Sequence, residues 1–205
     1  MRSVYFTADH HFHHKRIIEY CKRPFASVDA MNKELIALWN DTVAPGDLVY
    51  HLGDFGFGSA DKLTAIRKQL NGQIIMIRGN HDQLSDTAYR ERVGVEIQAP
   101  HWYRGMQLCH YPAQGDTQVE DRHLASRPYM PEGTWLLHGH VHDAWVVNGR
   151  QINVGVDVHG YRPIALEYVL EIIANNPAPQ DGPRAPPARK GPDTEGQAPL
   201  SHASP

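Results

Sequence analysis

Short apolar runs and longer stretches of helical spacing alternate along the first half of the chain. Three runs rich in β-forming residues predict buried strands at 4–8, 48–52 and 74–77. Apolar residues recur at helical spacing over 28–43 and 60–70, and a short helix is expected near 15–20. Since helices of this length can connect parallel strands, residues 1–82 predict a β-α-α-β-α-β unit.

Polar residues and glycine mark where these helices begin and end. Ser27 and Ser59 stand before the two longer helices, where a serine side chain can accept a hydrogen bond from the first turn. Asn71-Gly72 follows the second long helix, and glycine commonly ends helices. Arg23-Pro24-Phe25 separates the short helix from the first long one, because proline interrupts a helix.

The second half of the chain predicts shorter elements. After a short helix around 86–91, strand-like segments follow at 95–97, 101–104, 106–110 and 134–138. The stretch from Trp145 to Ile152 predicts a β-hairpin in which Asn148-Gly149 is the two-residue turn. Residues 113–133 predict a long loop, and long ordered loops often carry function.

The last patterned segment admits two interpretations. An amphipathic helix would place four apolar residues on one face, namely Leu166, Val169, Leu170 and Ile173. A strand over 164–170 fits the same residues.

The composition changes after Asn176. Eight of the 15 prolines lie beyond that residue, with few large apolar side chains among them. Such a segment cannot bury enough apolar surface to fold. We therefore expect one folded domain over 1–176 and a disordered, Pro-rich tail over 177–205.

Charge and composition describe an ordinary globular protein. The chain has 205 residues and a formal net charge of −3, so no global positive field attracts it to nucleic acid, although a nucleic-acid substrate stays open. No apolar run approaches the ~20 residues of a membrane span, and no signal peptide is evident at the start. Cys21 and Cys109 form no CxxC motif, which favours a reduced, cytoplasmic protein.

Five segments place metal-binding residue types directly after apolar runs. They are Asp9-x-His11, Gly53-Asp54, Asn80-His81-Asp82, His110 and His138-Gly139-His140-Val141-His142. Any one of them alone is better explained as a turn, a cap or a packed histidine. If the runs are strands of an open α/β sheet, all five segments lie at the edge where ligands bind, and coincidence is then a poor explanation.

The donor types indicate which metal this edge would bind. Imidazole, carboxylate and one amide oxygen, without thiolate, favour Mn, Fe or Zn over a structural cysteine site. At least seven candidate ligands are present, whereas one catalytic ion needs three. Two ions about 3.5–4 Å apart can clamp both oxygens of an in-line phosphoryl displacement and generate a hydroxide nucleophile at neutral pH.

These five ordered segments resemble the motifs of the calcineurin-like metallophosphoesterase superfamily. More narrowly, Arg23-Pro24-Phe25, His51-Leu52-Gly53-Asp54 and His110-Tyr111-Pro112 resemble its small bacterial and phage members. The resemblance implies an α/β fold, a four-layer α/β/β/α sandwich of two mixed sheets with the site at the carboxyl ends of the strands. It also implies a hydrolase that cleaves phosphate esters by in-line attack of a metal-bridging hydroxide.

The resemblance further implies a role for each residue. A first metal would be held by Asp9, His11 and His142, and a second by Asn80, His110 and His140. Asp54 would bridge the two. His81 would face the leaving oxygen without binding metal, and Asp82 would orient its ring. The cofactors would be two divalent metal ions, for which Mn²⁺ is the favoured identity and Fe, Zn or Ni are alternatives.

Two departures from related families narrow the substrate. Phe57 stands where purple acid phosphatases have a tyrosine ligand, three residues after the bridging Asp54. The Val-Asp-Arg-Gly type continuation of the phosphoprotein phosphatases, which carries a phosphate-clamping arginine, is absent. We therefore favour a phosphodiester, such as a cyclic nucleotide or a nucleic-acid strand, over a monoester or a phosphoprotein. The alternative from another class is a metal-binding scaffold without catalysis, but the presence of His81 favours an enzyme; the oligomeric state is left open.

Several residues near these motifs have two interpretations each. His10 is expected at the surface or behind the ligands, and His13 has no assigned role. His14 is open between a substrate contact and none. His51 and His138 either hydrogen-bond a metal-binding carboxylate or pack in the core.

Four further residues complete this group. Cys109 is expected to be a buried, inert thiol. Arg78 and Arg104 either bind phosphate or form surface ion pairs. Asp157 lies either in a turn or behind a metal ligand.

Overall fold

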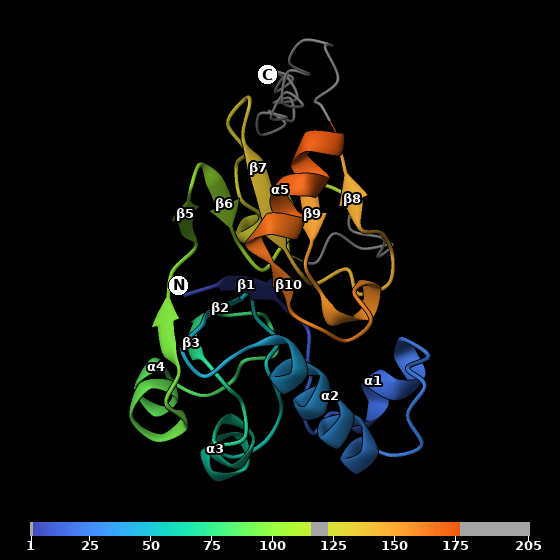
Figure 1. The fold of residues 1–205 in the computed structure, drawn as a ribbon, viewed down its shortest axis with the longest axis vertical. Coiled ribbons are helices and arrows are strands. Elements are labelled where there is room, and N and C mark those ends of the chain that lie inside the picture. Colours follow the sequence, from blue (N-terminus) through green and yellow to red (C-terminus); the bar gives the residue numbers. More distant parts are fainter. Residues whose placement is uncertain (1, 116–122, 177–205) are drawn as a thin grey trace, which may run out of the picture.

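Two five-stranded sheets form the framework of the protein (Figure 1). The structure is a computed structural model and describes residues 2–115 and 123–176. The predicted disordered tail over 177–205 and part of the loop predicted at 113–133 lie outside the described residues.

The first sheet contains the strands of the predicted β-α-α-β-α-β unit. Its order is β10 (Ile164–Ala165), β1 (Val4–Thr7), β2 (Leu48–His51), β3 (Gln73–Ile77) and β4 (Glu96–Gln98). Strands β1 to β4 are parallel, and β10 pairs antiparallel with β1. The carboxyl ends of β1, β2 and β3 therefore meet at one edge.

The second sheet is also mixed. Its order is β5 (His101–Tyr103), β6 (Met106–Leu108), β7 (Trp135–His138), β9 (Gln151–Asn153) and β8 (Val147–Asn148). The three central strands β6, β7 and β9 are parallel, whereas β5 and β8 at the edges are antiparallel to their neighbours.

Helices lie outside the two sheets. They are α1 (Lys15–Tyr20), α2 (Val28–Thr42), α3 (Ala60–Arg67), α4 (Asp86–Ala88) and α5 (Leu166–Asn175). In Figure 1, α2, α3 and α4 lie on the side of the first sheet, and α5 lies on the side of the second. There are also three short helical segments: the π-helix η1 (Tyr89–Val93) and the 3-10 helices η2 (Leu124–Ser126) and η3 (Val156–Val158).

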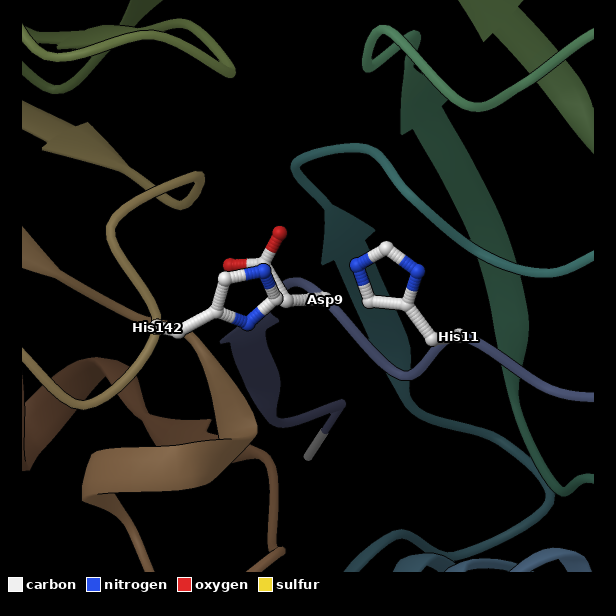
Figure 2. A group of neighbouring side chains, drawn as sticks. All are labelled: Asp9, His11 and His142. Atoms are coloured by element: carbon white, nitrogen blue, oxygen red, sulfur yellow. The ribbon is translucent and has the colours of Figure 1, made fainter. Parts of the chain in front are cut away.

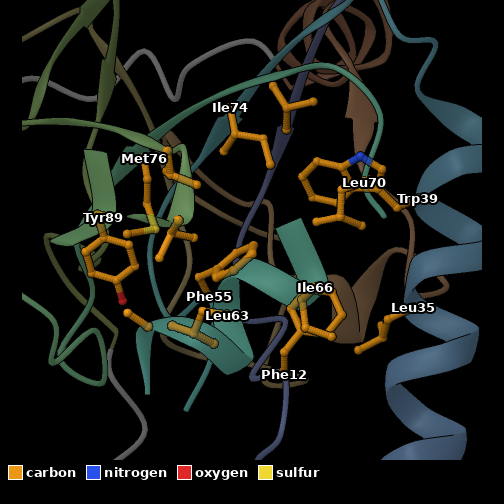
Figure 3. Packing of buried hydrophobic residues seen from close by; sticks show 14 of the residues in the cluster. Phe12, Leu35, Trp39, Phe55, Leu63, Ile66, Leu70, Ile74, Met76 and Tyr89 are labelled. Atoms are coloured by element: carbon orange, nitrogen blue, oxygen red, sulfur yellow. The ribbon is translucent and has the colours of Figure 1, made fainter. Parts of the chain in front are cut away.

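Alternation along the strands of the first sheet divides the core into two clusters. Val49, Ile74 and Met76 point to the helix side and pack with side chains of α2, α3 and η1 (Figure 3). The residues next to them in sequence, including Tyr50 and Ile75, point the other way and pack against the second sheet. α5 adds Leu166, Val169 and Ile172 to this second cluster. The predicted α/β/β/α arrangement with two mixed sheets is confirmed.

The structure corrects the predicted hairpin turn. Asn148 pairs with Gln151, so the two-residue turn is Gly149-Arg150 and not Asn148-Gly149. Gly149 has a φ of +60°, the left-handed value that the first central position of a type II′ turn requires. The hairpin itself is confirmed, one residue out of register.

The last segment contains both predicted elements in succession. β10 takes the two residues Ile164 and Ala165, and α5 follows at once. Leu170, expected on the buried face of the helix, is 44% exposed, and Ile172 is buried instead.

None of the helices in the described ranges has both the length and the apolar composition needed to cross a membrane.

The cap of α2 gives a test of the fold. The Ser27 hydroxyl accepts a hydrogen bond from the backbone N–H of Ala30 at 3.1 Å. Ser27→Ala should lower the free energy of unfolding by about 1 kcal/mol, because that N–H loses its acceptor. Ser27→Asp should retain wild-type stability, since a carboxylate caps equally well. Urea denaturation followed by circular dichroism measures both; equal stability of the Ser and Ala proteins would contradict this role.

Candidate metal centre

All five metal-type segments predicted from the sequence meet at one edge of the two sheets. Asp9 and His11 follow β1, Asp54 follows β2, Asn80 follows β3, His110 follows β6, and His140 and His142 follow β7. Ligand atoms of Asp9, His11 and His142 lie within 4.8 Å of one another, and so do those of Asp9, Asp54 and His110. The structure therefore brings together residues that are far apart in the sequence, up to the 133 positions that separate Asp9 from His142.

Backbone hydrogen bonds continue the parallel pairing beyond the strand ends. The N–H of Asp9 donates to the carbonyl of Gly53, and that of His11 donates to the carbonyl of Asp54, both at 3.0 Å. In the second sheet the Gly139 N–H donates to the His110 carbonyl, also at 3.0 Å. The loops that carry the candidate ligands are thus held side by side by their own main chain.

Most of the candidate ligands have an unusual backbone conformation. Five of the seven have a left-handed φ: Asp9 (61°), His11 (52°), Asp54 (57°), His140 (75°) and His142 (48°). For a residue with a Cβ atom, adopting this conformation costs roughly 1–2 kcal/mol. The conformation turns these side chains toward one another, and strain of this kind is commonly found at functional sites.

The first cluster consists of Asp9, His11 and His142. Figure 2 shows Asp9 and His11, from the segment after β1, beside the ring of His142, from the loop after β7. Asp9 Oδ2 accepts a hydrogen bond from the His140 N–H at 2.9 Å. Asp9 Oδ1 and both ring nitrogens of His11 are buried and have no hydrogen-bond partner among the described residues.

These atoms need a partner that the protein does not supply. Buried polar atoms are almost always hydrogen-bonded. Burial raises the pKa of Asp9 to about 7, because the charged carboxylate is poorly solvated there. A divalent cation would satisfy the carboxylate and the imidazole together, so these residues fit a metal ion.

The second cluster surrounds the amide oxygen of Asn80. This atom lies 3.1 Å from Nε2 of His110 and 3.1 Å from Nδ1 of His140. His110 donates its Nδ1–H to the carbonyl of Leu52 at 2.8 Å. Burial lowers the pKa of His110 to about 4, so its ring is neutral at pH 7 and Nε2 presents a lone pair to the Asn80 oxygen. Acceptor atoms at this separation can serve as neighbouring ligands of one cation.

Asp54 lies between the two clusters. Its Oδ2 atom is 3.4 Å from Nε2 of His11 and 3.6 Å from Nε2 of His110. Its Oδ1 atom accepts a hydrogen bond from the backbone N–H of His81 at 2.8 Å. One carboxylate oxygen is therefore close to a histidine of each cluster.

Two glycines are required by the close approach of these loops. A Cβ atom on Gly79 would lie 2.2 Å from Oδ1 of Asp54, and one on Gly139 would lie 2.6 Å from Oδ2 of Asp9. Any side chain at either position would displace a candidate ligand.

Asp82 has a different environment from the one expected. Its carboxylate accepts hydrogen bonds from the backbone N–H groups of Asp54 (2.7 Å), Phe55 (3.0 Å) and Gly79 (2.8 Å), and from the Tyr89 hydroxyl (3.1 Å). Among the described residues it makes no hydrogen bond to the ring of His81, so the expected Asp82–His81 contact is absent. Asp82 instead ties the loop after β2 to the loop after β3.

A buried ion pair behind His142 was not anticipated. Asp157 accepts a hydrogen bond from Nδ1 of His142 at 2.9 Å, and Arg23 binds both oxygens of Asp157, at 2.7 and 2.8 Å. Burial alone would lower the pKa of His142, but its hydrogen bond to Asp157 raises that pKa to about 11. The same bond holds the ring so that Nε2 is directed away from Asp157. Asp157 thus fits both interpretations, since it lies in the helical turn η3 and also behind the candidate ligand His142.

Arg23 lies beside the candidate ligands, although its sequence context predicts no role for it there. Besides Asp157, it donates to the backbone carbonyls of Asp9 (2.7 Å) and His10 (2.9 Å), and it is 3% exposed. It thus joins the segment after β1 to the loop that contains Asp157. Arg23-Pro24-Phe25 was noted as a motif and as a helix break, but nothing local indicates a partner 134 residues away.

The remaining histidines near the motifs are mainly structural. His10 is fully buried, not at the surface, and its Nδ1 lies 3.0 Å from Nε2 of His51. The ring of His13 contacts Asn32 at 3.0 Å. His138 bonds the carbonyl of Gly139 at 2.7 Å. Neither His51 nor His138 reaches a carboxylate through a hydrogen bond in the described part of the chain, so packing is the better account of both.

Three further residues had two possible roles or an expected one, namely Cys109, Arg78 and Arg104. Cys109 is buried, and burial raises its thiol pKa, as expected for an inert thiol. Arg78 bonds the carboxylate of Asp86 at 3.1 Å and the carbonyls of Asp82 and Leu84, so it stabilises the turn after β3. Arg104 is exposed on the turn between β5 and β6.

A cavity of about 700 Å³ opens onto the candidate metal centre. Its lining includes five residues of the candidate centre and its surroundings, namely Asp54, Asn80, His81, His140 and His142. His14, Phe57 and residues of α1 also line it. The volume is that of a small-molecule site, and the group that reacts would lie over the clustered ligands.

Comparison with known proteins agrees with this geometry. A family model described as the calcineurin-like phosphoesterase superfamily domain matches residues 4–159. The chain is 36% identical over 182 residues to the uncharacterized protein MJ1445 of Methanocaldococcus jannaschii, with 84% of this chain and 92% of that protein covered. It is 28% identical over 200 residues to the Gene 66 protein of Mycobacterium phage L5, with 84% and 95% covered.

One solved structure extends the likeness to the fold. The protein of unknown function AQ665 from Aquifex aeolicus matches with a TM-score of 0.63 and 26% identity, covering 84% of this chain and all (100%) of that one. The family match confirms the resemblance identified from the motifs. The phage relative agrees with the narrower resemblance to small bacterial and phage members.

The Arg23–Asp157 pair gives a test of the metal centre. Asp157→Asn removes the carboxylate that holds Nδ1 of His142 and leaves Arg23 buried without a counter-charge. Replacing such a partner of a metal-binding histidine typically weakens metal affinity about 10–100-fold. Isothermal titration of Mn²⁺ into chelator-treated Asp157→Asn should show that loss, with the far-ultraviolet circular dichroism unchanged.

A matched ion pair elsewhere in the chain serves as the control. Arg162 binds Asp41 at 2.6 Å at the surface, where the Asp41 side chain is exposed and that of Arg162 is partly exposed. Arg162→Met should leave Mn²⁺ affinity unchanged, whereas Arg23→Met should lower it. Wild-type affinity in both Asp157→Asn and Arg23→Met would contradict the positioning role.

Proposed function

The chain belongs to the calcineurin-like phosphoesterase superfamily and is a metal-dependent hydrolase of phosphate esters, and we propose that it uses two divalent ions and prefers phosphodiesters. One observation carries the proposal of two ions. Oδ2 of Asp54 lies 3.4 Å from a histidine nitrogen of the first cluster and 3.6 Å from one of the second. A single ion would not need both clusters.

Each cluster would hold one ion. The first ion would be bound by Asp9, His11 and His142, the second by Asn80, His110 and His140, and Asp54 would reach both. The mixture of oxygen and imidazole donors without thiolate suits Mn²⁺, with Fe, Zn and Ni as alternatives. When bound, the ions supply Lewis acidity toward the phosphate oxygens and a hydroxide nucleophile near neutral pH.

His81 is the proposed proton donor to the leaving oxygen. Its ring lines the cavity and lies 5.4 Å from His11 and 5.2 Å from Phe57, measured between ring centroids. Its backbone N–H is fixed by Asp54, whereas the described residues offer its ring nitrogens no hydrogen-bond partner. The ring can therefore turn to the substrate and deliver a proton to it.

In this proposal Asp82 has a positioning role and takes no part in the transfer of the proton from His81. By accepting from three backbone N–H groups it fixes the distance between Asp54 and the loop that carries Asn80 and His81. In this proposal it positions His81 through the backbone of that loop.

The charges around the cavity favour a diester. Among the described residues, Arg16 is the one arginine that lines the cavity, because neither Arg78 nor Arg104 lines it. A monoester carries nearly two negative charges at pH 7, and sites that bind such groups commonly use arginines in a bidentate manner. A diester carries one charge and needs less compensation from the protein.

Substitution of the bridging residue tests the proposed function. With Mn²⁺ present, the wild-type protein should hydrolyse bis(p-nitrophenyl) phosphate faster than p-nitrophenyl phosphate. Asp54→Ala and His140→Ala should abolish both reactions and lower the bound metal measured by mass spectrometry. Asp41→Ala, an exposed aspartate of α2, is the control and should behave as wild type. Full metal-dependent activity in both site variants would contradict the assignment of the site.

His81→Ala separates proton transfer from metal binding. The variant should retain the wild-type metal content, while kcat falls by about 10²–10⁴-fold because general acid–base catalysis contributes that much. His101→Ala, whose ring bonds the carbonyl of Ala99 away from the cavity, is the matched control. Unchanged turnover in His81→Ala would remove this residue from the mechanism.

A further inference from the structure

Aromatic rings line one side of the cavity from its rim to His81. Tyr20, on the last turn of α1, meets His14 edge-on, with 6.4 Å between ring centroids. His14 in turn stacks on Phe57 at 4.1 Å with 28° between the planes. Phe57 lies 5.2 Å from His81, the proposed proton donor. We name Tyr20, His14 and Phe57 the aromatic wall.

The outer end of this wall is open. Tyr20 is 63% exposed, although it lines the cavity, so one of its faces contacts solvent and not protein. Isolated exposed aromatic residues are common and carry no meaning alone. Here the exposed ring continues a series of rings that ends at the reacting centre.

The base of the wall is rigid. Ile17 of α1 is buried in the core cluster on the helix side of the first sheet, which fixes the helix that carries Tyr20. Arg23 further holds the segment after α1 through the carbonyls of Asp9 and His10. A ring that is already in place loses little conformational freedom when a second ring stacks on it.

A positive charge accompanies the wall. Arg16 precedes Tyr20 by one helical turn and lines the same cavity. It is exposed, and the described residues provide it with neither a hydrogen bond nor an ion pair. A guanidinium and open aromatic faces together suit a planar, electron-rich ring attached to an anion.

We propose that Tyr20, His14 and Phe57 form a subsite for a planar aromatic group esterified to the phosphate, so that the substrates are phosphodiesters with an aryl or nucleobase-bearing arm. This inference rests on the proposed function, because it takes the phosphate to lie over the metal centre. It adds a specificity element that the metal ligands alone do not provide, since in the proposed function they hold the ions and do not reach the rest of the ester.

The test compares two competitive inhibitors that differ only in the ring. Inhibition of bis(p-nitrophenyl) phosphate hydrolysis by phenylphosphonate and by methylphosphonate gives a Ki for each. Stacking of one ring contributes about 1–3 kcal/mol, which is roughly 5–150-fold in affinity. Tyr20→Ala should therefore raise the Ki of phenylphosphonate about tenfold and leave that of methylphosphonate within about twofold. Tyr20→Phe should retain both values, because it keeps the ring.

A second pair of ligands identifies the source of the ring. The dinucleotide thymidylyl-thymidine replaces phenylphosphonate in the same assay, and a loss of its affinity in Tyr20→Ala assigns the wall to nucleobases. A loss restricted to phenylphosphonate assigns it to simple aryl esters. Tyr168→Ala, a 45% exposed tyrosine on α5, is the matched control and should change none of the Ki values.

Two results would overturn the subsite. One is an equal change of both phosphonates in Tyr20→Ala, and the other is no change in any aromatic ligand. If the wild-type protein hydrolyses no phosphate ester with any divalent metal, the proposed function fails instead. Calorimetric binding of the two phosphonates to wild type and Tyr20→Ala then tests the subsite independently of turnover.

Discussion

Backbone pairing beyond the ends of the strands is the constraint on which the candidate metal centre depends. Asp9 and His11 are held beside Gly53 and Asp54 by hydrogen bonds of 3.0 Å, although the strands themselves end at Thr7 and His51. Without these bonds, the left-handed conformations of Asp9, His11 and Asp54 would relax, since each is disfavoured in an isolated loop. The side chains would then turn away from one another. The sheet therefore stabilises the arrangement, and the ligands occupy the positions that it enforces.

A second layer of contacts acts on the side chains. Arg23 and Asp157 are almost fully buried and form a bidentate pair, and each also reaches the metal centre, Arg23 through the Asp9 carbonyl and Asp157 through His142. A buried ion pair contributes little net stability, because removing both charges from water is costly. Its value here lies in geometry, since it fixes the orientation of the His142 ring and joins two segments that are far apart in the chain.

The sequence predicted the parts of this protein that depend on local patterns. Strand and helix positions in the first 82 residues follow from apolar spacing, and the candidate ligands follow from polar residues after strands. The hairpin register was wrong by one residue, because Gly149 fits either central position of a tight turn and cross-strand pairing decides between them. Leu170 was placed on the buried face because helical spacing alone does not specify how α5 rotates on the sheets.

The contacts that were missed share one property. Three contacts join residues from separate segments of the chain: Arg23 with Asp157, Asp82 with the N–H groups of Asp54 and Phe55, and His10 with His51. No local spacing indicates such a pair, since it forms only when two strand ends are brought together.

Asp82 shows why residue type is a poor guide to role at such an edge. A carboxylate next to a histidine in sequence suggests that the carboxylate orients the ring, and that was the expectation. In the structure the carboxylate is directed to three N–H groups at the crossing of two loops, because those donors would otherwise be buried without acceptors. The Asp82 carboxylate therefore serves the buried N–H groups, which need an acceptor, and not the ring of His81, although His81 is its neighbour in sequence. Among the described residues the nitrogens of the His81 ring have no hydrogen-bond partner, which leaves them available for the proposed transfer of a proton to the leaving oxygen.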